Sequence, residues 1–111
     1  MEIIGIFKAL SDKTRLRIFW MLLHNKLCVC EIIEVLKMSQ SRISRHMGIL
    51  KQAGLINEER KGKWVIYNLS ESLQKELIDY IRKKLKKDLI CIEDKKRMDI
   101  VLQKKLCPFE K

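Results

Sequence analysis

The stretch SQSRISRHMGILKQAGL, residues Ser39–Leu55, has the pattern of one amphipathic helix that begins and ends within it. Ser39 is a favourable N-cap, and Gly54 is the residue type that most often ends a helix. The apolar residues between them recur at the spacing of a single helix face: Ile43, Met47 and Leu50. The stretch therefore predicts a helix with one buried seam.

The other faces of this predicted helix carry side chains that hydrogen-bond to base edges and phosphate groups. They gather in the first two turns, the end that a recognition helix points into the major groove of DNA. No acidic residue occurs between Val35 and Asn57. An ordinary amphipathic helix with a solvated basic face is the alternative. The residues expected to contact DNA are Ser39, Gln40, Ser41, Arg42, Ser44, Arg45, His46 and Lys51.

The segments before Ser39 have helical patterns as well. Residues 2–10 predict a short helix that needs a packing partner, and residues 13–24 predict a second helix with Arg15 and Arg17 facing solvent. Residues 27–37 predict a third, which a tight turn joins to the basic helix. Two helices joined by a short turn, the second of them basic, are typical of a helix-turn-helix.

After Gly54 the pattern alternates, which predicts a β-hairpin of residues 55–60 and 63–69 joined at Lys61-Gly62. Its tip carries Arg60, Lys61 and Lys63, so the hairpin forms a wing able to touch phosphate or the minor groove beside the recognition helix. A surface hairpin whose lysines serve solubility is the alternative. The expected fold class is mainly α with a small β-hairpin (α+β), a winged helix-turn-helix.

The C-terminal part predicts further helices. A helix capped by Ser70, Glu71 or Ser72 presents an apolar stripe that needs a partner. Pairing this stripe and the N-terminal helix with a second copy would give a homodimer with recognition helices one DNA turn apart. We therefore expect a DNA-binding and dimerisation domain over residues 1–88 and a C-terminal extension over 89–111, helical before Pro108.

Charge and composition support a polyanionic partner. The chain of 111 residues has a formal net charge of +10, which is spread over both halves. The longest apolar run, Ile18 to Leu23, is too short to span a membrane. The N-terminus has no basic segment typical of a signal peptide, so we expect a cytoplasmic protein. There the four cysteines are expected to be reduced, as ligands or core thiols.

Several phrases together resemble the ArsR/SmtB metalloregulators, which are dimeric repressors released from operator DNA by a metal or metalloid. The phrases are FKALSDKTRLRI (residues 7–18), LCVCEI (27–32), SQSRISRHM (39–47), LKQAGLI (50–56) and GKWVIY (62–67). The LCVCE phrase is similar to the arsenic-sensing branch, in which both cysteines and a third residue three positions further bind As(III) or Sb(III). Cys28 and Cys30 match, whereas the third position is Ile33. No His follows His46, so the histidine ligands of zinc-sensing members are missing.

The chemistry of Cys28 and Cys30 agrees with such a sensor, because soft thiolates select soft ions and As(III) prefers three sulfur ligands. Residues i and i+2 point to different sides of an ideal helix, so binding is expected to hold this pair out of helical geometry. Because the pair leads directly into the helix-turn-helix, ligand binding there would tilt the recognition helix or change its spacing across the dimer.

The third sulfur is expected from Cys107, near the C-terminus beside Pro108, with Cys91 as the alternate. Either cysteine would otherwise be a small buried apolar residue. Zinc, cadmium or lead would fit the same thiolates as arsenic, and the sequence leaves the choice open. The alternative hypothesis is a winged-helix regulator that binds DNA constitutively or is controlled by thiol oxidation.

An enzyme is not expected, and neither is a small-molecule substrate. Cys91 and Arg97 have the C-x₅-R spacing of thiol phosphatases, but the residues between them include no glycine and two carboxylates. The two histidines, His24 and His46, lie in predicted helices and form no hydrolase pattern with a serine.

Overall fold

The chain opens with three helices that lead to the predicted recognition helix. The computed structural model describes residues 2–108. Its first elements are α1 (Ile3–Leu10), α2 (Lys13–His24), the short strand β1 (Leu27–Cys28), α3 (Val29–Leu36) and α4 (Gln40–Gln52). They are followed by β2 (Ile56–Lys61), β3 (Trp64–Leu69), α5 (Lys75–Leu85) and α6 (Leu89–Gln103). The predicted fold class, mainly α with a small β-hairpin, is confirmed.

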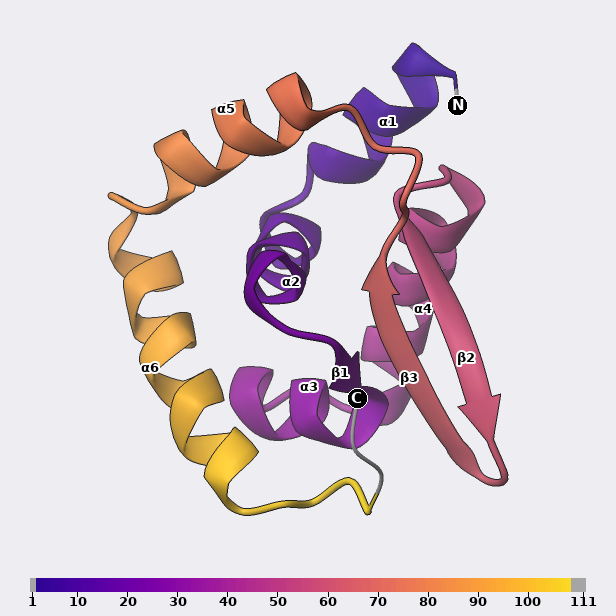
Figure 1. Cartoon of the computed structure of the whole chain (residues 1–111), viewed down its shortest axis with the longest axis vertical. Coiled ribbons are helices and arrows are strands. Elements are labelled where there is room, and N and C mark those ends of the chain that lie inside the picture. Colours follow the sequence, from indigo (N-terminus) through magenta and orange to yellow (C-terminus); the bar gives the residue numbers. More distant parts are fainter. Residues whose placement is uncertain (1, 109–111) are drawn as a thin grey trace.

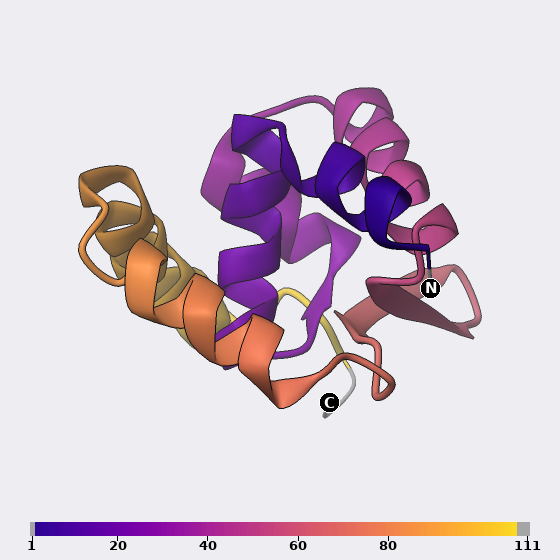
Figure 2. The same ribbon diagram turned by 90° about the horizontal axis from the view of Figure 1, so that it is seen from above.

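Helix α2 lies in the middle of the molecule, with the other elements around it (Figure 1). It contacts α1, α4, α5, α6 and β3. Seen from above, α1 and α4 lie on one side of α2, and α6 and the C-terminal end of α5 lie on the other (Figure 2). The fully buried Ile18, Phe19 and Met21 therefore form the centre of the core.

The predicted seam and both ends of α4 are confirmed. The Ser39 side chain accepts a hydrogen bond from the Arg42 amide at 3.3 Å. Gly54 has φ of 81° and donates to the Lys51 carbonyl at 3.0 Å, which closes the helix with a left-handed residue. The three seam residues are at most 1% exposed: Ile43, Met47 and Leu50.

The sheet has one strand more than the sequence pattern predicted. β1 pairs antiparallel with β3, and the order across the sheet is β1-β3-β2. Because β1 has only two residues, Leu27 and Cys28, alternation could not reveal it. The hairpin turn lies at Gly62-Lys63, one residue later than expected, since Lys61 pairs with Trp64 in the register.

Two further predictions differ from the structure. One concerns the start of α5, and the other concerns the arginine side chains of α2. Helix α5 begins at Lys75, because Ser70 and Ser72 hydrogen-bond to each other in a turn at 2.8 Å instead of capping the helix. Arg15 and Arg17 do not face solvent, because each has acceptors on other elements. Arg17 donates two hydrogen bonds to the buried Asp94 of α6, at 2.8 and 2.9 Å.

Helix α6 belongs to the same core as the rest of the molecule. Its Cys91, Met98 and Val101 are at most 5% exposed and pack with the side chains of α2 and α3. Trp20 of α2 donates a hydrogen bond to the Cys91 carbonyl at 2.8 Å. Residues expected to form an extension therefore complete the core. Among residues 2–108, no helix is both long and apolar enough to cross a membrane.

Candidate DNA-binding surface and cysteine site

The outer face of α4 offers polar and basic side chains to a partner. Its first turns follow the Ser39 cap, so free amides and side-chain donors lie together at the end of the helix that carries a positive partial charge. Burial of the apolar seam fixes which face is outward. The predicted contacts that are exposed on this face are Ser39, Gln40, Ser41, Arg42, Ser44, Arg45 and Lys51.

His46 is the exception among these predicted contacts. Its side chain is 18% exposed and turns toward the start of α2. Its Nδ1 atom lies 3.2 Å from an Arg15 nitrogen and 3.9 Å from Asp12 Oδ1. Burial is the largest influence on this ring and lowers the pKa of His46 below its ordinary value of 6.5. His46 is therefore held in a contact between helices.

The hairpin brings basic side chains beside α4. Arg60 and Lys63 are exposed, whereas Lys61 is half-buried with its Nζ 3.7 Å from a Glu59 carboxylate oxygen. Lys51 of α4 forms an ion pair with Glu58 of β2, and this hydrogen bond lowers the pKa of Glu58. This ion pair joins the last turn of α4 to strand β2 of the hairpin.

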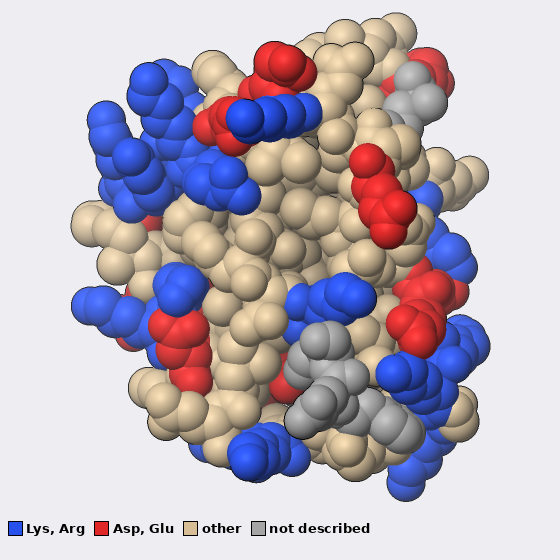
Figure 3. Space-filling view, in the orientation of Figure 1, with Lys and Arg blue, Asp and Glu red and all other residues tan. Residues whose placement is uncertain are grey.

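Lysines and arginines are not evenly distributed over the molecule. In the view of Figure 3, blue side chains gather over the hairpin tip at the lower right and over the end of α5 at the upper left. The surface between these groups is formed mostly by uncharged residues, with scattered acidic and a few basic side chains. The basic hairpin tip thus agrees with the position predicted for a wing.

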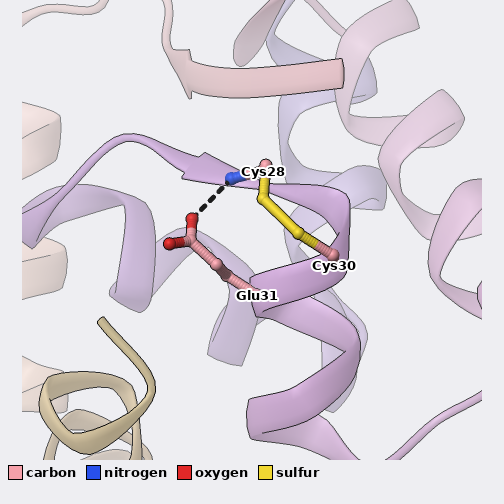
Figure 4. The surroundings of a disulfide bond; sticks show 3 residues. All are labelled: Cys28, Cys30 and Glu31. Carbon is pink, nitrogen blue, oxygen red and sulfur yellow. Dashed lines mark hydrogen bonds between the residues drawn. A yellow bond between two sulfur atoms is a disulfide. The ribbon is translucent and has the colours of Figure 1, made fainter. Parts of the chain in front are cut away.

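Cys28 and Cys30 meet at the start of α3. Cys28 is the N-cap with an extended backbone, at φ −85° and ψ 161°, and Cys30 is the second residue of the helix. The two sulfur atoms form a disulfide (Figure 4). The expectation of reduced cysteines is therefore wrong for this pair in this state. Only Cys28 lies outside helical geometry, which is enough to bring both sulfurs to one side.

Hydrogen bonds and strand pairing hold the backbone around this pair. The Cys28 amide donates a hydrogen bond to the Glu31 carboxylate at 2.8 Å, and Glu31 itself is 2% exposed (Figure 4). The carboxylate of the third helical residue thereby caps the first turn. Cys28 also pairs with Ile66 in the β1–β3 ladder. Cys28 therefore belongs at once to the start of helix α3, to the sheet and to the disulfide.

The C-terminal tail brings Cys107 to this point. After α6 the chain turns and passes below α3 in the view of Figure 1. Cys107 is 8% exposed and packs in one small buried cluster with Cys28 and Ile66, against which Cys30 also lies. The sequence pattern pointed to Cys107 only through its place beside Pro108. The place of Ile66 in this cluster was missed, because nothing local distinguishes it from other strand residues.

Cys91, the alternate ligand, lies elsewhere. It is 2% exposed, and burial raises the pKa of its thiol to about 12. Cys91 and Arg97 lie on helix α6, where Arg97 is 3.8 Å from Glu93, so the C-x₅-R spacing forms no phosphate-binding loop. Within residues 2–108, no group of three or more His, Cys, Asp and Glu side chains is arranged to hold a metal ion. Since two of the candidate sulfurs are bonded to each other, metal binding would require their reduction.

The fold and both sites can be compared with known proteins. A model described as bacterial regulatory protein, arsR family, matches residues 12–58. An uncharacterized HTH-type transcriptional regulator of Methanocaldococcus jannaschii, MJ1325, is 43% identical over 77 residues, which are 68% of this chain and 86% of that protein. The chain belongs to the ArsR family. It is thus a transcriptional regulator with a winged helix-turn-helix for binding DNA.

Other ArsR-family proteins extend the comparison. The arsenical resistance operon repressor of Bacillus subtilis is 42% identical over 84 residues, covering 70% of this chain and 80% of that protein. The structure of HlyU from Vibrio cholerae N16961 matches with a TM-score of 0.67 at 34% identity, over 73% of this chain and 88% of that chain. The segment matched by the ArsR-family model contains Cys28, Cys30 and α4, whereas Cys107 lies outside it.

Proposed function

We propose that this ArsR-family regulator is a dimeric repressor that leaves its operator when a soft metalloid, As(III) or Sb(III), binds to Cys28, Cys30 and Cys107. The single observation behind the proposal is that Cys107 packs in the buried cluster of Cys28 at the start of α3. Three thiolates are the donor set that these ions prefer. The arsenical resistance repressor of Bacillus subtilis, similar over 80% of its length, supports this choice of ligand.

DNA binding by this regulator is proposed to use α4 for sequence and the hairpin for affinity. The outward side chains of α4 have the donors that read base edges, above all Arg45 and Gln40. Arg60 and Lys63 at the wing are suited to phosphate contacts, which position the protein without reading sequence. No catalytic role or small-molecule substrate is proposed for these residues.

A dimer is proposed because α1 leaves large apolar side chains uncovered. Ile3, Ile4 and Phe7 are 63, 58 and 59% exposed. Ile3 and Phe7 line a groove of about 540 Å³ between α1 and the start of α5, together with Leu73 and Leu77. A second copy presenting the same surface would fill both grooves at once, as a twofold interface requires.

The route from the cysteines to DNA is short in the chain and in space. Cys28 is the N-cap of helix α3 and Lys37 is its C-cap, whose left-handed backbone forms the turn into α4. Reduced Cys28 and Cys30 must lose their protons to bind a metalloid, and their positions set the first turn of α3. Movement of that turn is transmitted along α3 to α4, and the tail at Cys107 would be drawn in with it.

The test is a DNA shift assay on the reduced protein, with and without arsenite. The DNA is a duplex selected from a random pool by the wild-type protein, and an unselected duplex of equal length serves for comparison. We expect arsenite to release the selected duplex from wild type and from Cys91→Ser, but not from Cys28→Ser or Cys30→Ser. Arsenite release that survives in both of these last variants contradicts the proposal. Parallel titrations with zinc, cadmium and lead decide which ion acts at the lowest concentration.

A second candidate function, control by thiol oxidation, is favoured by the Cys28–Cys30 disulfide. In this case the reduced and oxidised proteins would differ in DNA affinity without any metal. The experiment is the same shift assay with peroxide in place of arsenite, followed by reduction. Release that dithiothreitol reverses, together with loss of two free thiols, supports oxidation control. Unchanged binding after full disulfide formation excludes it.

A further inference from the structure

Arg15 connects three helices at a point between the exposed face of α1 and the recognition helix. Its side chain is 14% exposed. Its Nε donates to the Ala9 carbonyl, in the last turn of α1, at 2.6 Å. Its backbone amide donates to Asp12, the N-cap of α2, at 3.0 Å. Arg15 thereby satisfies a carbonyl that the end of α1 leaves without a helical partner.

The same guanidinium reaches α4. Its Nη1 lies 3.2 Å from Nδ1 of His46. A guanidinium group can only donate, so this contact requires that Nδ1 accepts and that the ring is neutral with its proton on Nε2. Asp12 lies 3.9 Å from both Nη1 and Nδ1, and completes a polar group of three residues. On its own helix, His46 also senses the charges of Arg42 and Arg45.

The contact between Arg15 and His46 gives α4 a directional restraint that its apolar seam lacks. Hydrophobic burial of the seam has little directional preference, so the seam alone tolerates small rotations of the helix about its axis. His46 lies about 60° around the helix from the centre of the seam, on the side of Arg42. A directional hydrogen bond at this distance from the axis opposes rotation. We propose that Arg15 is a positioning residue for DNA recognition, which sets the rotation of α4 through His46.

Direct contact of Arg15 with DNA fits the geometry less well. Its donors are directed to the carbonyls of Lys8 and Ala9 and to His46, and little of its surface is accessible. The role requires the planar fork of arginine, because donors in different directions must reach two helices at once. A lysine in its place would keep the charge and lose this geometry.

The test is a double-mutant cycle of Arg15→Ala and His46→Leu on the reduced full chain. The probes are a duplex selected from a random pool by wild type and an unselected duplex of equal length. Each single variant should bind the selected duplex about ten-fold more weakly, the size of one charge-assisted hydrogen bond. The double variant should bind no more weakly than the weaker single variant. Lys8→Gln, which removes an exposed charge from α1, is the matched control.

Further readouts separate positioning from other roles. Affinity for the unselected duplex and the salt dependence of binding should change in Arg15→Ala no more than in Lys8→Gln. His46→Asn, which keeps an acceptor near the position of Nδ1, should retain most of the selected affinity, whereas Arg15→Lys should not. Equal losses on both duplexes with a salt slope lower by about one would make Arg15 a phosphate contact instead.

Effects on folding are excluded by measuring binding below the melting temperature of every variant. If Arg15→Ala does not fold, the comparison of His46→Asn with His46→Leu carries the test, because neither change touches α1. Additive losses in the cycle overturn the proposal, as do equal affinities of His46→Asn and His46→Leu for the selected duplex.

Discussion

At the scale of single residues, the four cysteines have three different environments. Cys28 and Cys30 are joined at the start of α3, Cys107 packs against them from the tail, and Cys91 is buried on α6. A thiolate is the metal-binding form of cysteine, and burial holds the Cys91 pKa at about 12. We therefore expect Cys91 to bind metals and metalloids much less readily than the other three cysteines.

The variants Cys107→Ser and Cys91→Ser should differ in their affinity for arsenite. Loss of Cys107 leaves two sulfurs, so we expect the charge-transfer absorbance of the reduced protein to need at least ten-fold more arsenite. Cys91→Ser should titrate like wild type. The measurement is an absorbance titration at neutral pH. A variant lacking Cys107 that titrates normally would remove this residue from the proposed site.

Acidification should weaken the fold through its two histidines. Burial lowers the pKa of His46 and of His24 below 6.5, so the unfolded chain binds more protons than the folded chain once the pH falls through that value. The free energy of unfolding should accordingly decrease from pH 7.5 to 5.5, above the range in which carboxylates titrate. Urea unfolding at both values measures the decrease. His46→Gln should reduce it, and a steeper decrease in that variant would contradict the assignment.

At the scale of elements, α4 and the hairpin are suited to the two kinds of DNA contact proposed for them. The exposed Arg45 lies on the outward face of α4, opposite the buried Ile43 and Met47. Lys63 lies at the hairpin turn, with its ammonium 5.7 Å from the centre of the Trp64 ring. The first position is suited to reading bases, and the second to phosphate.

Arg45→Ala and Lys63→Ala should consequently weaken DNA binding in different ways. Arg45→Ala should cost about 1–3 kcal/mol on a selected duplex and little on an unselected one. Lys63→Ala should weaken both duplexes alike and lower the salt slope by about one. Binding isotherms at several salt concentrations measure both effects. The same pattern of loss in the two variants would argue against separate roles.

At the scale of the whole molecule, α6 closes the core that α1 to α5 leave open. Arg17 and Asp94 join α2 to α6 through a buried ion pair whose members lie 77 positions apart in the chain. Removal of one partner from such a pair is costly, because the other charge stays buried. The tail that carries Cys107 begins where α6 ends.

A fragment of residues 1–88 should therefore not fold stably. It would lose the burial of Cys91, Met98 and Val101 and leave Arg17 without its carboxylate. At about 1.5–3 kcal/mol for each large apolar side chain, this approaches the whole stability of a small domain. Circular dichroism melting of the fragment beside the full chain measures the loss. A cooperative transition within a few degrees of wild type would show that α6 is dispensable.

The proposed dimer should depend on the exposed face of α1. Phe7→Glu places a charge in the groove that Phe7 lines, and should raise the dimer dissociation constant by at least ten-fold. Ile100→Glu is the control, because Ile100 is also 59% exposed but lies on α6. Sedimentation velocity at several concentrations compares them with wild type. Equal weakening in both variants would place the interface elsewhere.

The sequence alone determined the elements whose causes are local. Ser39, Gly54 and the apolar seam act within a few residues of one another, so their pattern was sufficient to predict α4. The alternation after Gly54 likewise predicted the hairpin, with its turn one residue too early. Only the tertiary structure decided that Arg15 and Arg17 face acceptors on other helices, that β1 pairs with β3, and that Cys107 instead of Cys91 packs beside Cys28. These contacts join positions far apart in the chain, and they follow from how the whole core packs.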